Sequence, residues 1–296
     1  MGILRVMSVS VRLLTFAALL AGVFAVAALA GDEADLGKAE KNTHAGPEPK
    51  GHPMNQTTQT EDTHGEESID PVRGLAVSED SHTLNLARTT AVPGKRFELG
   101  FQILDAEGQT VHDFDVEHTK RMHFIVARRD LTGFQHLHPT QAPDGSWSVH
   151  MTLDDPGVYR VFADFSTSGE PRTLGADLTV DGDARSTPLP APAKSVSVDG
   201  LKVALTSAQA DAGEATELTY VVTRDGKPVA IEPYLGARGH LVALREGDLA
   251  FLHVHPDADR LRFMSEFPSA GRYRLFLQFK TGGRVHTAAI TQQVAQ

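Results

Sequence analysis

Cysteine is absent from this chain of 296 residues. Without thiols the protein forms no disulfide and uses no thiolate nucleophile, iron–sulfur cluster or cysteine-ligated zinc site, and no cysteine is present to carry a lipoprotein lipid. Aromatic residues make up only 6% of the chain, and the formal net charge of -10 argues against a broad nucleic-acid-binding face. Imidazole, in contrast, is abundant, because the chain holds 14 His against one Trp and four Tyr.

The N-terminal residues predict export. Arg5 and Arg12 form a positively charged start, residues 13–30 are apolar except for one threonine, and Ala28-Leu29-Ala30 has the small-x-small pattern of a signal-peptidase site. We therefore expect a signal peptide over residues 1–30 and an extracellular or cell-envelope protein. If the segment stays uncleaved, its apolar run is long enough to act as an N-terminal membrane anchor.

Residues 31–71 are expected to be a disordered tether. Between residues 31 and 70 the chain has ten acidic residues, three lysines and almost no large apolar side chains. Such a segment buries too little apolar surface to offset the entropy cost of ordering. The tether contains three histidines, His44, His52 and His64, and we interpret them as solvated linker residues.

The rest of the chain is an internal duplication. Residues 123–139 align with residues 240–256 without a gap, and a proline-rich stretch separates the two copies. Repeats of this length indicate two copies of one domain. We place the domains at residues 72–181 and 196–294, joined by a stiff linker over residues 182–195.

Each copy predicts short strands. Phe97-Glu98-Leu99-Gly100-Phe101 and Leu218-Thr219-Tyr220 alternate apolar residues with small or polar ones, which is the period of a half-buried strand. Asp-Gly pairs such as Asp225-Gly226 mark turns. Asp155-Pro156-Gly157-Val158-Tyr159 has the pattern of a tyrosine corner, in which a Tyr hydroxyl binds back to the preceding loop. The predicted fold class is all-β, with two tandem Ig-like antiparallel β-sandwich domains; cupredoxin-like sandwiches are the alternative.

Six histidines occupy matched positions in the two copies. They are His123, His136 and His138 in the first copy and His240, His253 and His255 in the second. In both copies 13 residues separate the first histidine from the second, and the third follows two residues later, which on a strand places those two on one face about 6.6–7 Å apart. If the intervening residues form a hairpin, the first histidine lies directly opposite the second, and Pro139 or Pro256 ends the strand.

Three imidazoles on one face suit Cu²⁺ or Zn²⁺. Because a protonated imidazole cannot ligate, we expect metal affinity to fall as the pH drops through the histidine pKa near ~6.5. A structural role for these histidines remains the alternative, since a duplication copies structural residues as faithfully as ligands.

A fourth ligand in each copy is suggested by His150 and Met264, each seven residues before the matched glycines Gly157 and Gly271. A thioether would favour Cu⁺, although a Met on a strand is more often a core residue. The other histidines of the folded region have no histidine counterpart and no support as ligands. They are His82, His112, His118 and His286.

The motif around the first copy can be compared with known families. It reads Lys120-Arg121-Met122-His123-Phe124-Ile125-Val126, then Asp130-Leu131-Thr132-Gly133-Phe134-Gln135-His136-Leu137-His138-Pro139. This pattern resembles the heavy-metal-binding or copper-resistance-associated exported proteins of bacteria. The second copy departs from it at Arg238-Gly239, before its first histidine. The resemblance implies that the first copy's three motif histidines overlap metal ligands.

Two enzyme families are also similar in part. Phe251-Leu252-His253-Val254-His255 is similar to the copper-ligand strand of copper–zinc superoxide dismutases, but the zinc-side residues and the disulfide of that family are missing. A cupin dioxygenase needs a Glu soon after its His-x-His pair, and Pro139-Thr140-Gln141-Ala142-Pro143 provides none. No phosphate-binding glycine loop or nucleophile elbow is present either. We therefore expect no enzyme.

The sequence predicts an extracytoplasmic metal-binding protein that sequesters or transfers copper, with zinc as the second choice. The expected partners are the metal ion and a membrane metal transporter or metal chaperone, and nucleic acid is not among them. The alternative is a secreted adhesion or interaction module in which the histidines are structural.

Overall fold

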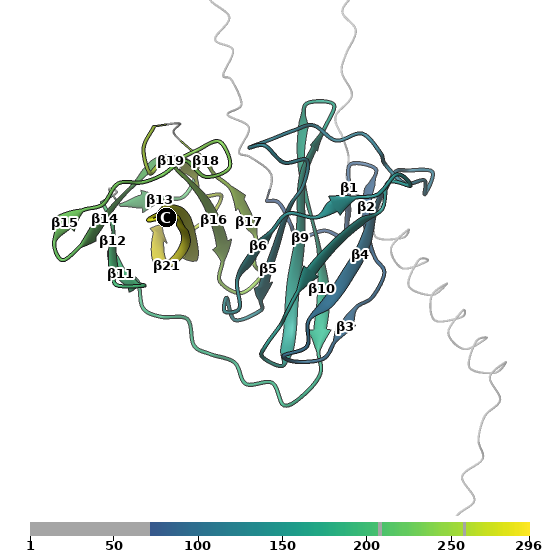
Figure 1. The fold of residues 1–296 in the computed structure, drawn as a ribbon, viewed down its shortest axis with the longest axis horizontal. Coiled ribbons are helices and arrows are strands. Elements are labelled where there is room, and N and C mark those ends of the chain that lie inside the picture. The colour runs from purple at the N-terminus through teal and green to yellow at the C-terminus, as the bar shows by residue number, and fades with distance from the viewer. Residues whose placement is uncertain (1–71, 207–208, 257–258) are drawn as a thin grey trace, which may run out of the picture. The chain divides into compact units, whose positions relative to one another are not determined.

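The computed structural model describes residues 72–206, 209–256 and 259–296. The predicted signal peptide and tether, with the tether's histidines, lie outside the described residues, and so do the side chains of His253 and His255. The described part is all-β and forms two β-sandwiches of the same topology within one compact unit (Figure 1). This confirms the predicted fold class of two tandem Ig-like sandwiches.

The first sandwich, called repeat 1 below, holds strands β1 to β10. Its outer sheet has the order β1-β2-β4-β8-β7, formed in that order by Ser78–Glu79, His82–Leu86, Phe97–Leu104, Trp147–Met151 and Thr140–Gln141. Its inner sheet has the order β3-β10-β9-β5-β6, formed by Thr90–Ala91, Glu170–Val180, Gly157–Thr167, His123–Arg128 and Gln135–Leu137. All neighbouring strands are antiparallel except β3 and β10, which are parallel.

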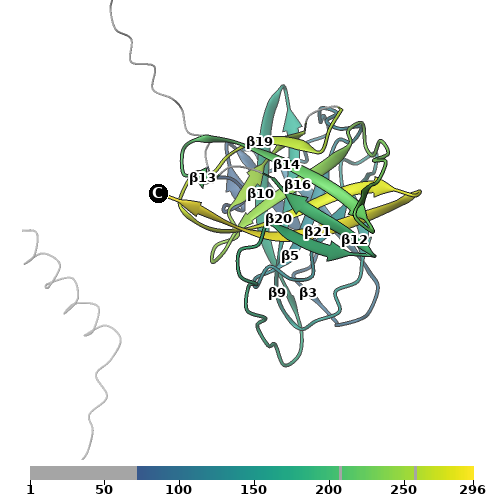
Figure 2. The ribbon, with the colours of Figure 1, turned by 90° about the vertical axis from the view of Figure 1, so that its left-hand side faces the viewer.

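The second sandwich, repeat 2, holds strands β11 to β21. Its outer sheet has the order β11-β12-β14-β19-β18, formed by Ser195–Val198, Leu201–Leu205, Ala215–Arg224, Arg262–Glu266 and His255–Pro256, and β15 (Lys227–Pro228) pairs with β14. Its inner sheet has the order β13-β21-β20-β16-β17, formed by Ala210–Asp211, Arg284–Ala295, Gly271–Thr281, Gly239–Arg245 and Phe251–His253. The strand order repeats that of repeat 1, and β20 and β21 form a long hairpin (Figure 2), as β9 and β10 do in repeat 1.

Each sandwich has an apolar core between its two sheets. Every second side chain is buried along much of β4 and of β14, as the alternating sequence predicts. The tyrosine corner is present in both copies: the hydroxyl of Tyr159 donates to the carbonyl of Asp155 at 2.9 Å, and that of Tyr273 donates to the carbonyl of Ser269 at 3.0 Å. The same local constraint therefore fixes the start of β9 and of β20.

The inner sheets of the two repeats pack against each other through a third apolar cluster. Every residue of β5 is buried, because one face covers the core of repeat 1 and the other meets repeat 2. Phe134 stacks on Phe276 with ring centroids 4.1 Å apart, and Phe162 lies 5.4 Å from Phe251. Phe251 is the repeat-2 counterpart of Phe134, and Phe162 is the repeat-1 counterpart of Phe276. The contact is thus pseudo-symmetric, like the interface of a twofold dimer.

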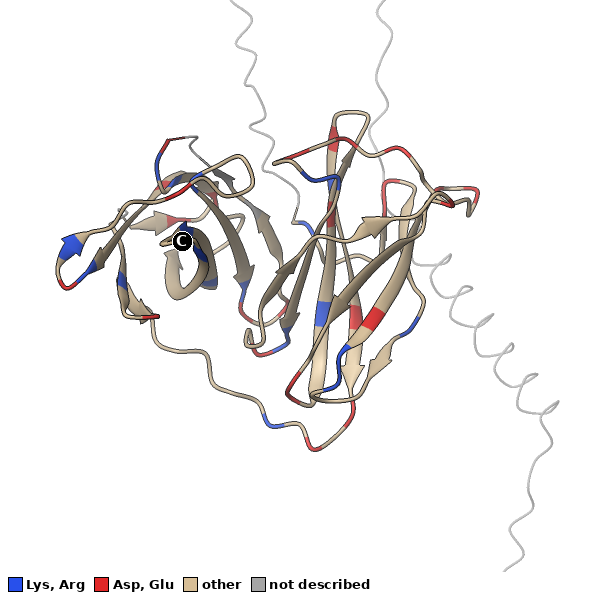
Figure 3. Ribbon diagram, viewed as in Figure 1, with Lys and Arg blue, Asp and Glu red and all other residues tan. Residues whose placement is uncertain are grey.

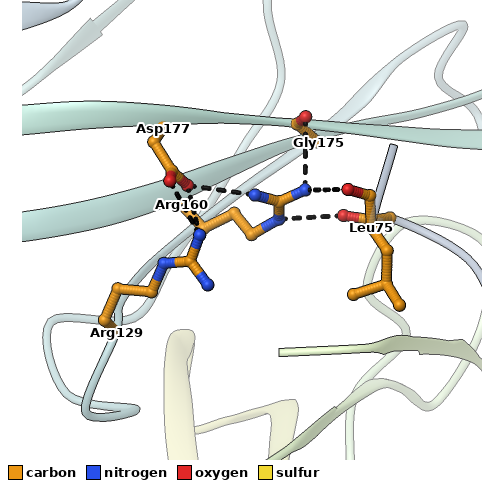
Figure 4. A network of polar contacts seen from close by, with 6 residues as sticks. Leu75, Arg129, Arg160, Gly175 and Asp177 are labelled. Carbon is orange, nitrogen blue, oxygen red and sulfur yellow. Dashed lines mark hydrogen bonds and ion pairs between the residues drawn. The ribbon is translucent and has the colours of Figure 1, made fainter. Parts of the chain in front are cut away.

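The chain segment that enters β1 lies at this interface. Arg160 on β9 holds it, with a guanidinium that donates to three backbone carbonyls and pairs with one carboxylate (Figure 4). The partners are Gly74, Leu75, Gly175 and Asp177, at 2.9, 2.7, 3.3 and 3.0 Å. The amide of Phe251 in repeat 2 donates to the carbonyl of Arg73 at 3.0 Å, so the segment is bonded to both repeats.

Charged side chains lie mainly in loops and near strand ends (Figure 3). β5 carries one charged residue, Arg128 at its end, and β6 carries none. The strands that bear the histidine motif are therefore nearly neutral. In the part of the chain that the structure describes, no helix is long and apolar enough to cross a membrane.

Candidate metal centre

The predicted hairpin forms, but its register differs by two residues from the expected one. β5 and β6 pair Ile125 with His136, so His123 lies diagonal to His136 and the predicted direct pairing is wrong. The turn between the strands, which holds Leu131 in the left-handed region (φ 65°), is centred one residue later than direct pairing requires. Because the shift is even, the two histidines still share a face of the sheet.

The third motif histidine lies where the chain leaves one sheet for the other. His138 directly follows β6, and the next strand, β7, belongs to the outer sheet. In repeat 2, β16 pairs Val242 with His253 in the same shifted register, while His255 begins β18 of the outer sheet. Pro256 is the last residue of β18, and the two residues after it lie outside the described part. β18 is an edge strand, where a missing N–H is tolerated.

His123, His136 and His138 converge into one cluster, called the triad below. One ligand nitrogen from each ring lies within 4.8 Å of the others. The ring centroids of His123 lie 5.2 Å from those of both other members, which are 4.8 Å apart. Imidazoles bound to one ion at ~2.0–2.1 Å in tetrahedral geometry have centroids about 5 Å apart. The triad therefore has the spacing of a shared ion.

Hydrogen bonds fix the tautomers of two triad rings. Nε2 of His123 lies 3.2 Å from the carbonyl oxygen of Glu117, and since a carbonyl only accepts, this nitrogen carries the proton. Nδ1 of His136 lies 2.8 Å from Oε1 of Gln278 in repeat 2. The amide nitrogen of Gln278 donates to Thr287, so its Oε1 accepts the proton of His136.

The remaining nitrogens of these two rings face each other. Nδ1 of His123 and Nε2 of His136 are 3.0 Å apart, and in neutral rings with these tautomers both carry lone pairs. Nε2 of His138 is buried and has no hydrogen-bond partner among the described residues. Unsatisfied polar atoms are costly in an interior. A metal ion among the three rings would accept all three lone pairs.

Burial favours the neutral form, which ligates metals, in two rings of the triad, His136 and His138. Desolvation, followed by the nearby His123 and His138, lowers the pKa of His136 to about 3. Desolvation, followed by His123, lowers the pKa of His138 to about 4. The same cause lowers the pKa of His240 to about 4. A proton on Nε2 of His136 is therefore a poor solution to the opposed lone pairs, because burial strongly disfavours the imidazolium form of this ring.

Repeat 2 closes the site from the other side. A cavity of about 40 Å³ is lined by His118, His123, His136 and the buried Asp164 of repeat 1 and by His240 of repeat 2, and its other lining side chains are apolar. The ring of His240 lies 6.4 Å from that of His123 and 6.1 Å from that of His136. The cavity is large enough to hold a water molecule or a metal ion, since one water needs at least roughly 10–15 Å³.

Sequence reasoning missed His118 and Gln278. His118 stands 5.3 Å, centroid to centroid, from His240, but its repeat-2 counterpart is Leu235, so the repeat comparison gave it no support. His118 and Leu235 both occupy turns at positive φ, 46° and 51° respectively. Gln278 did leave a signal in the sequence, because Gln278 and its counterpart Asp164 are polar residues within apolar stretches of β20 and β9.

The two predicted fourth ligands, His150 and Met264, lie in the outer sheets. His150 and Met264 occupy equivalent outer-sheet positions, opposite Glu98 and Glu217 respectively, and both are exposed. His150 does not belong to the cluster formed by the described residues. Met264 pairs across β18 and β19 with His255, one of its predicted co-ligands in repeat 2, so its role as a ligand stays a prediction. Met264 is not a core residue, since its side chain is 49% exposed. The roles of His253 and His255 stay predictions, because their side chains lie outside the described part.

Comparisons with solved structures find other β-sandwich proteins. They include the Escherichia coli adhesin FdeC (16% identity, TM-score 0.26, covering 74% of this chain and 65% of that one). A titin structure has 12% identity and a TM-score of 0.22, covering 73% and 98%. Fibronectin(III)-like modules of Clostridium thermocellum CbhA have 12% identity and a TM-score of 0.21, covering 72% and 93%. These similarities assign no function to the chain.

Sequence comparison places both repeats in one family. No curated protein matches the chain significantly. The family described as a domain of unknown function, DUF8832, matches twice, over residues 76–182 and 196–296. These two matches cover most of the chain and coincide with the two sandwiches. The chain therefore belongs to the DUF8832 family and carries two consecutive copies of its domain.

Proposed function

We propose that this protein is an extracytoplasmic metal-binding protein that sequesters or transfers copper, with zinc as the second choice of ion. The observation that carries the proposal is the 3.0 Å approach of two lone-pair nitrogens, on His123 and His136, beside the unpartnered nitrogen of His138. Histidines that serve only packing normally find a partner for each buried nitrogen. A metal ion supplies the partner that this cluster lacks.

The surroundings of the triad support the same proposal. The second nitrogen of His123 is held by a backbone carbonyl and that of His136 by a side-chain amide. Metal-binding histidines are usually oriented in this way, through the ring nitrogen that does not ligate. Three neutral imidazoles suit Cu²⁺ and Zn²⁺. The preference for copper rests on the resemblance of the histidine motif, and export rests on the N-terminal residues.

Burial moves the pH range over which binding should weaken. From the sequence, a fall in affinity is expected near pH ~6.5, the pKa of an exposed histidine. The lowered pKa values of His136 (about 3) and His138 (about 4) mean that protons compete with the metal for these two rings only at lower pH. Such a site would retain its ion in a mildly acidic compartment.

A titration tests the proposal. The purified protein is titrated with Cu²⁺, with Cu⁺ under reducing conditions and with Zn²⁺, each in competition with a chromophoric chelator. The double variant His136→Ala/His138→Ala should lose the tightest site. The matched control, His112→Ala/His150→Ala, removes two exposed histidines outside the triad and should bind like the original protein. Equal binding by the triad variant and the original protein would contradict the proposal.

The second candidate is a secreted adhesion or interaction module in which the histidines are structural. FdeC, one of the similar structures, is an adhesin, which fits this candidate better than metal binding. Its TM-score of 0.26 extends the likeness no further than the fold. If this candidate is correct, no metal raises the melting temperature, and the triad variant changes only the stability of the metal-free protein.

A further inference from the structure

His240 is the imidazole that repeat 2 contributes to the cavity beside the triad. It is the second residue of β16 and is only 7% exposed. Its place in repeat 2 is that of His123 in repeat 1, and the pseudo-symmetric packing of the inner sheets brings the two counterparts together. Their ring centroids are 6.4 Å apart. A buried histidine of one repeat therefore lies next to the triad of the other.

The orientation of His240 is fixed in the same way as that of His123. Nε2 of His240 lies 2.9 Å from the carbonyl oxygen of Tyr234, six residues earlier, just as Nε2 of His123 lies 3.2 Å from that of Glu117. The carbonyl must accept, so Nε2 of His240 carries the proton and Nδ1 carries the lone pair. The ring is thus prepared for metal ligation through the same nitrogen as His123.

The distances place His240 just outside a four-ligand arrangement. Tetrahedral binding by imidazoles requires centroids about 5 Å apart, and His240 lies 6.1 and 6.4 Å from the centroids of His136 and His123. A displacement of roughly 1 Å, within the reach of a χ1 and χ2 adjustment, would bring the ring of His240 to that spacing from His123 and His136. The three triad rings alone leave one tetrahedral position open.

A second element of repeat 2 already serves the site. Gln278, on β20 next to β16, orients His136 through the 2.8 Å hydrogen bond to Nδ1. Two adjacent strands of repeat 2 therefore reach the repeat-1 triad, one with a positioning amide and the other with an imidazole. An ion bound there would contact groups that depend on the docking of both repeats.

We infer that the ion bound by the triad takes Nδ1 of His240 as its fourth ligand, so that metal binding joins repeat 1 to repeat 2. This inference rests on the proposed function and adds the coordination number and the inter-repeat character of the site. His118 and Asp164 are the competing fourth ligands from within repeat 1, since both line the same cavity. A water molecule is the remaining choice. If Asp164 or water is the fourth ligand, the original protein shows three imidazoles and one oxygen, which would overturn the inference.

X-ray absorption on the Zn²⁺ form distinguishes these ligands. The full chain is loaded with half an equivalent of Zn²⁺, so that only the tightest site fills, and the number of imidazoles is counted. We expect four in the original protein and in His118→Ala, and three plus one oxygen in His240→Ala. Affinity should fall by at least about 10-fold in His240→Ala, the lower end of what loss of an orienting partner costs.

A matched control is His286→Ala, which removes another buried histidine of repeat 2, 4% exposed and bonded through Nδ1 to Asp199. It should lower stability without changing the number of ligands or the affinity. Hydrogen exchange gives a second measurement: Zn²⁺ should slow amide exchange in both β5 and β16 of the original protein, and in β5 alone of His240→Ala.

The outcomes separate this inference from the proposed function. If the original protein binds no metal tightly, both fail. If His138→Ala loses the tight site while His240→Ala keeps four imidazoles and full affinity, the inference is wrong and the proposed function stands. Loss of an imidazole in His118→Ala would overturn the inference in favour of His118. If His240→Ala loses the tight site and His138→Ala keeps it, the ion belongs to repeat 2, which also overturns the inference.

Discussion

His136 of repeat 1 donates from Nδ1 to Oε1 of Gln278 in repeat 2, at 2.8 Å across the interface between the sandwiches. The two residues are 142 positions apart in the chain. This one bond fixes the tautomer of His136 and leaves Nε2, the nitrogen that faces His123, as an acceptor. The candidate metal centre therefore depends on a residue that the histidine motif does not contain.

Replacing Gln278 tests this dependence. Gln278→Leu removes the acceptor, so the ring of His136 is free to rotate or change tautomer, and metal affinity should fall about 10–100-fold. Gln278→Glu keeps an acceptor at the same place and should retain the affinity of the original protein. Both are measured by chelator competition. Unchanged affinity in the Leu variant would show that the bond does not position the ligand.

The ring pairs at the interface should couple the stabilities of the two repeats. Phe276 is 4% exposed and stacks on Phe134 at 4.1 Å, so Phe276→Ala should cost about 3–5 kcal/mol of unfolding free energy. A double-mutant cycle with Phe134→Ala should give a coupling of about 0.5–1.5 kcal/mol. The control cycle pairs Phe276 with Phe114, a residue of the separate repeat-1 core, and should be additive. Urea unfolding measures both, and additivity in the first cycle would contradict the interface.

Gly74 has no space for a side chain. Its φ is +73°, and an added Cβ would lie 2.8 Å from the ring of Phe162 and 2.9 Å from Cβ of Phe251. Gly74→Ala should therefore destabilise the protein by more than the ~1 kcal/mol that left-handed backbone alone costs. Gly94→Ala is the control, because φ is +68° there and nothing lies within 4 Å. Equal melting temperatures for the two variants would refute this account.

The hydrogen bonds of Arg160 should contribute more to the stability of the folded protein than its ion pair with Asp177 alone. The Arg160 side chain is 8% exposed and satisfies three carbonyls, so Arg160→Met leaves these acceptors without a charged donor and should cost about 2–3 kcal/mol. Arg129 binds the same carboxylate, Asp177, but is 39% exposed. Arg129→Met should cost less than about 1 kcal/mol. Thermal unfolding compares the two, and similar losses would mean that the carbonyl bonds contribute little.

The metal-free protein should lose stability on acidification. The folded-state pKa of His136 is lowered from 6.5 to about 3. Between these values the unfolded chain binds a proton that the folded protein does not, so the stability present above pH 6.5 is lost progressively as the pH falls toward 3. His136→Gln cannot be protonated and should show a weaker dependence. Urea unfolding from pH 7 to pH 4.5 measures the effect, and parallel curves for the two proteins would contradict it.

The sequence alone determined the fold class and most of the local structure. Alternating apolar residues predict β4 and β14 because a strand on a sandwich buries every second side chain. The tyrosine-corner pattern around Tyr159 is local as well, since its hydrogen bond spans four residues. The gapless match of the two histidine motifs predicts a repeated domain, and the strand orders of the two sandwiches agree. Short-range patterns of this kind can be recognised in the sequence without knowing how the strands pack.

Three features of the site were decided by tertiary structure. The hairpin register depends on where the turn is centred, and a turn holding a left-handed Leu131 is not readable from residue types that rarely adopt that conformation. His118 lacked repeat support because Leu235 stands at its counterpart. His150 matched Met264 in the alignment, yet β8 and β19 lie in the outer sheets, and alignment does not say which sheet a strand joins.

What the sequence supplied to the candidate centre is the spacing that brings His123, His136 and His138 to the same end of the β5–β6 hairpin, and a register shift of two residues leaves His123 and His136 on one face. What only the tertiary structure decided is that His240 and Gln278 arrive at the same place. Their arrival depends on two sandwiches packing through matching apolar faces. In the sequence those faces look like ordinary buried strands, since burial against a second domain and burial in a core require the same side chains.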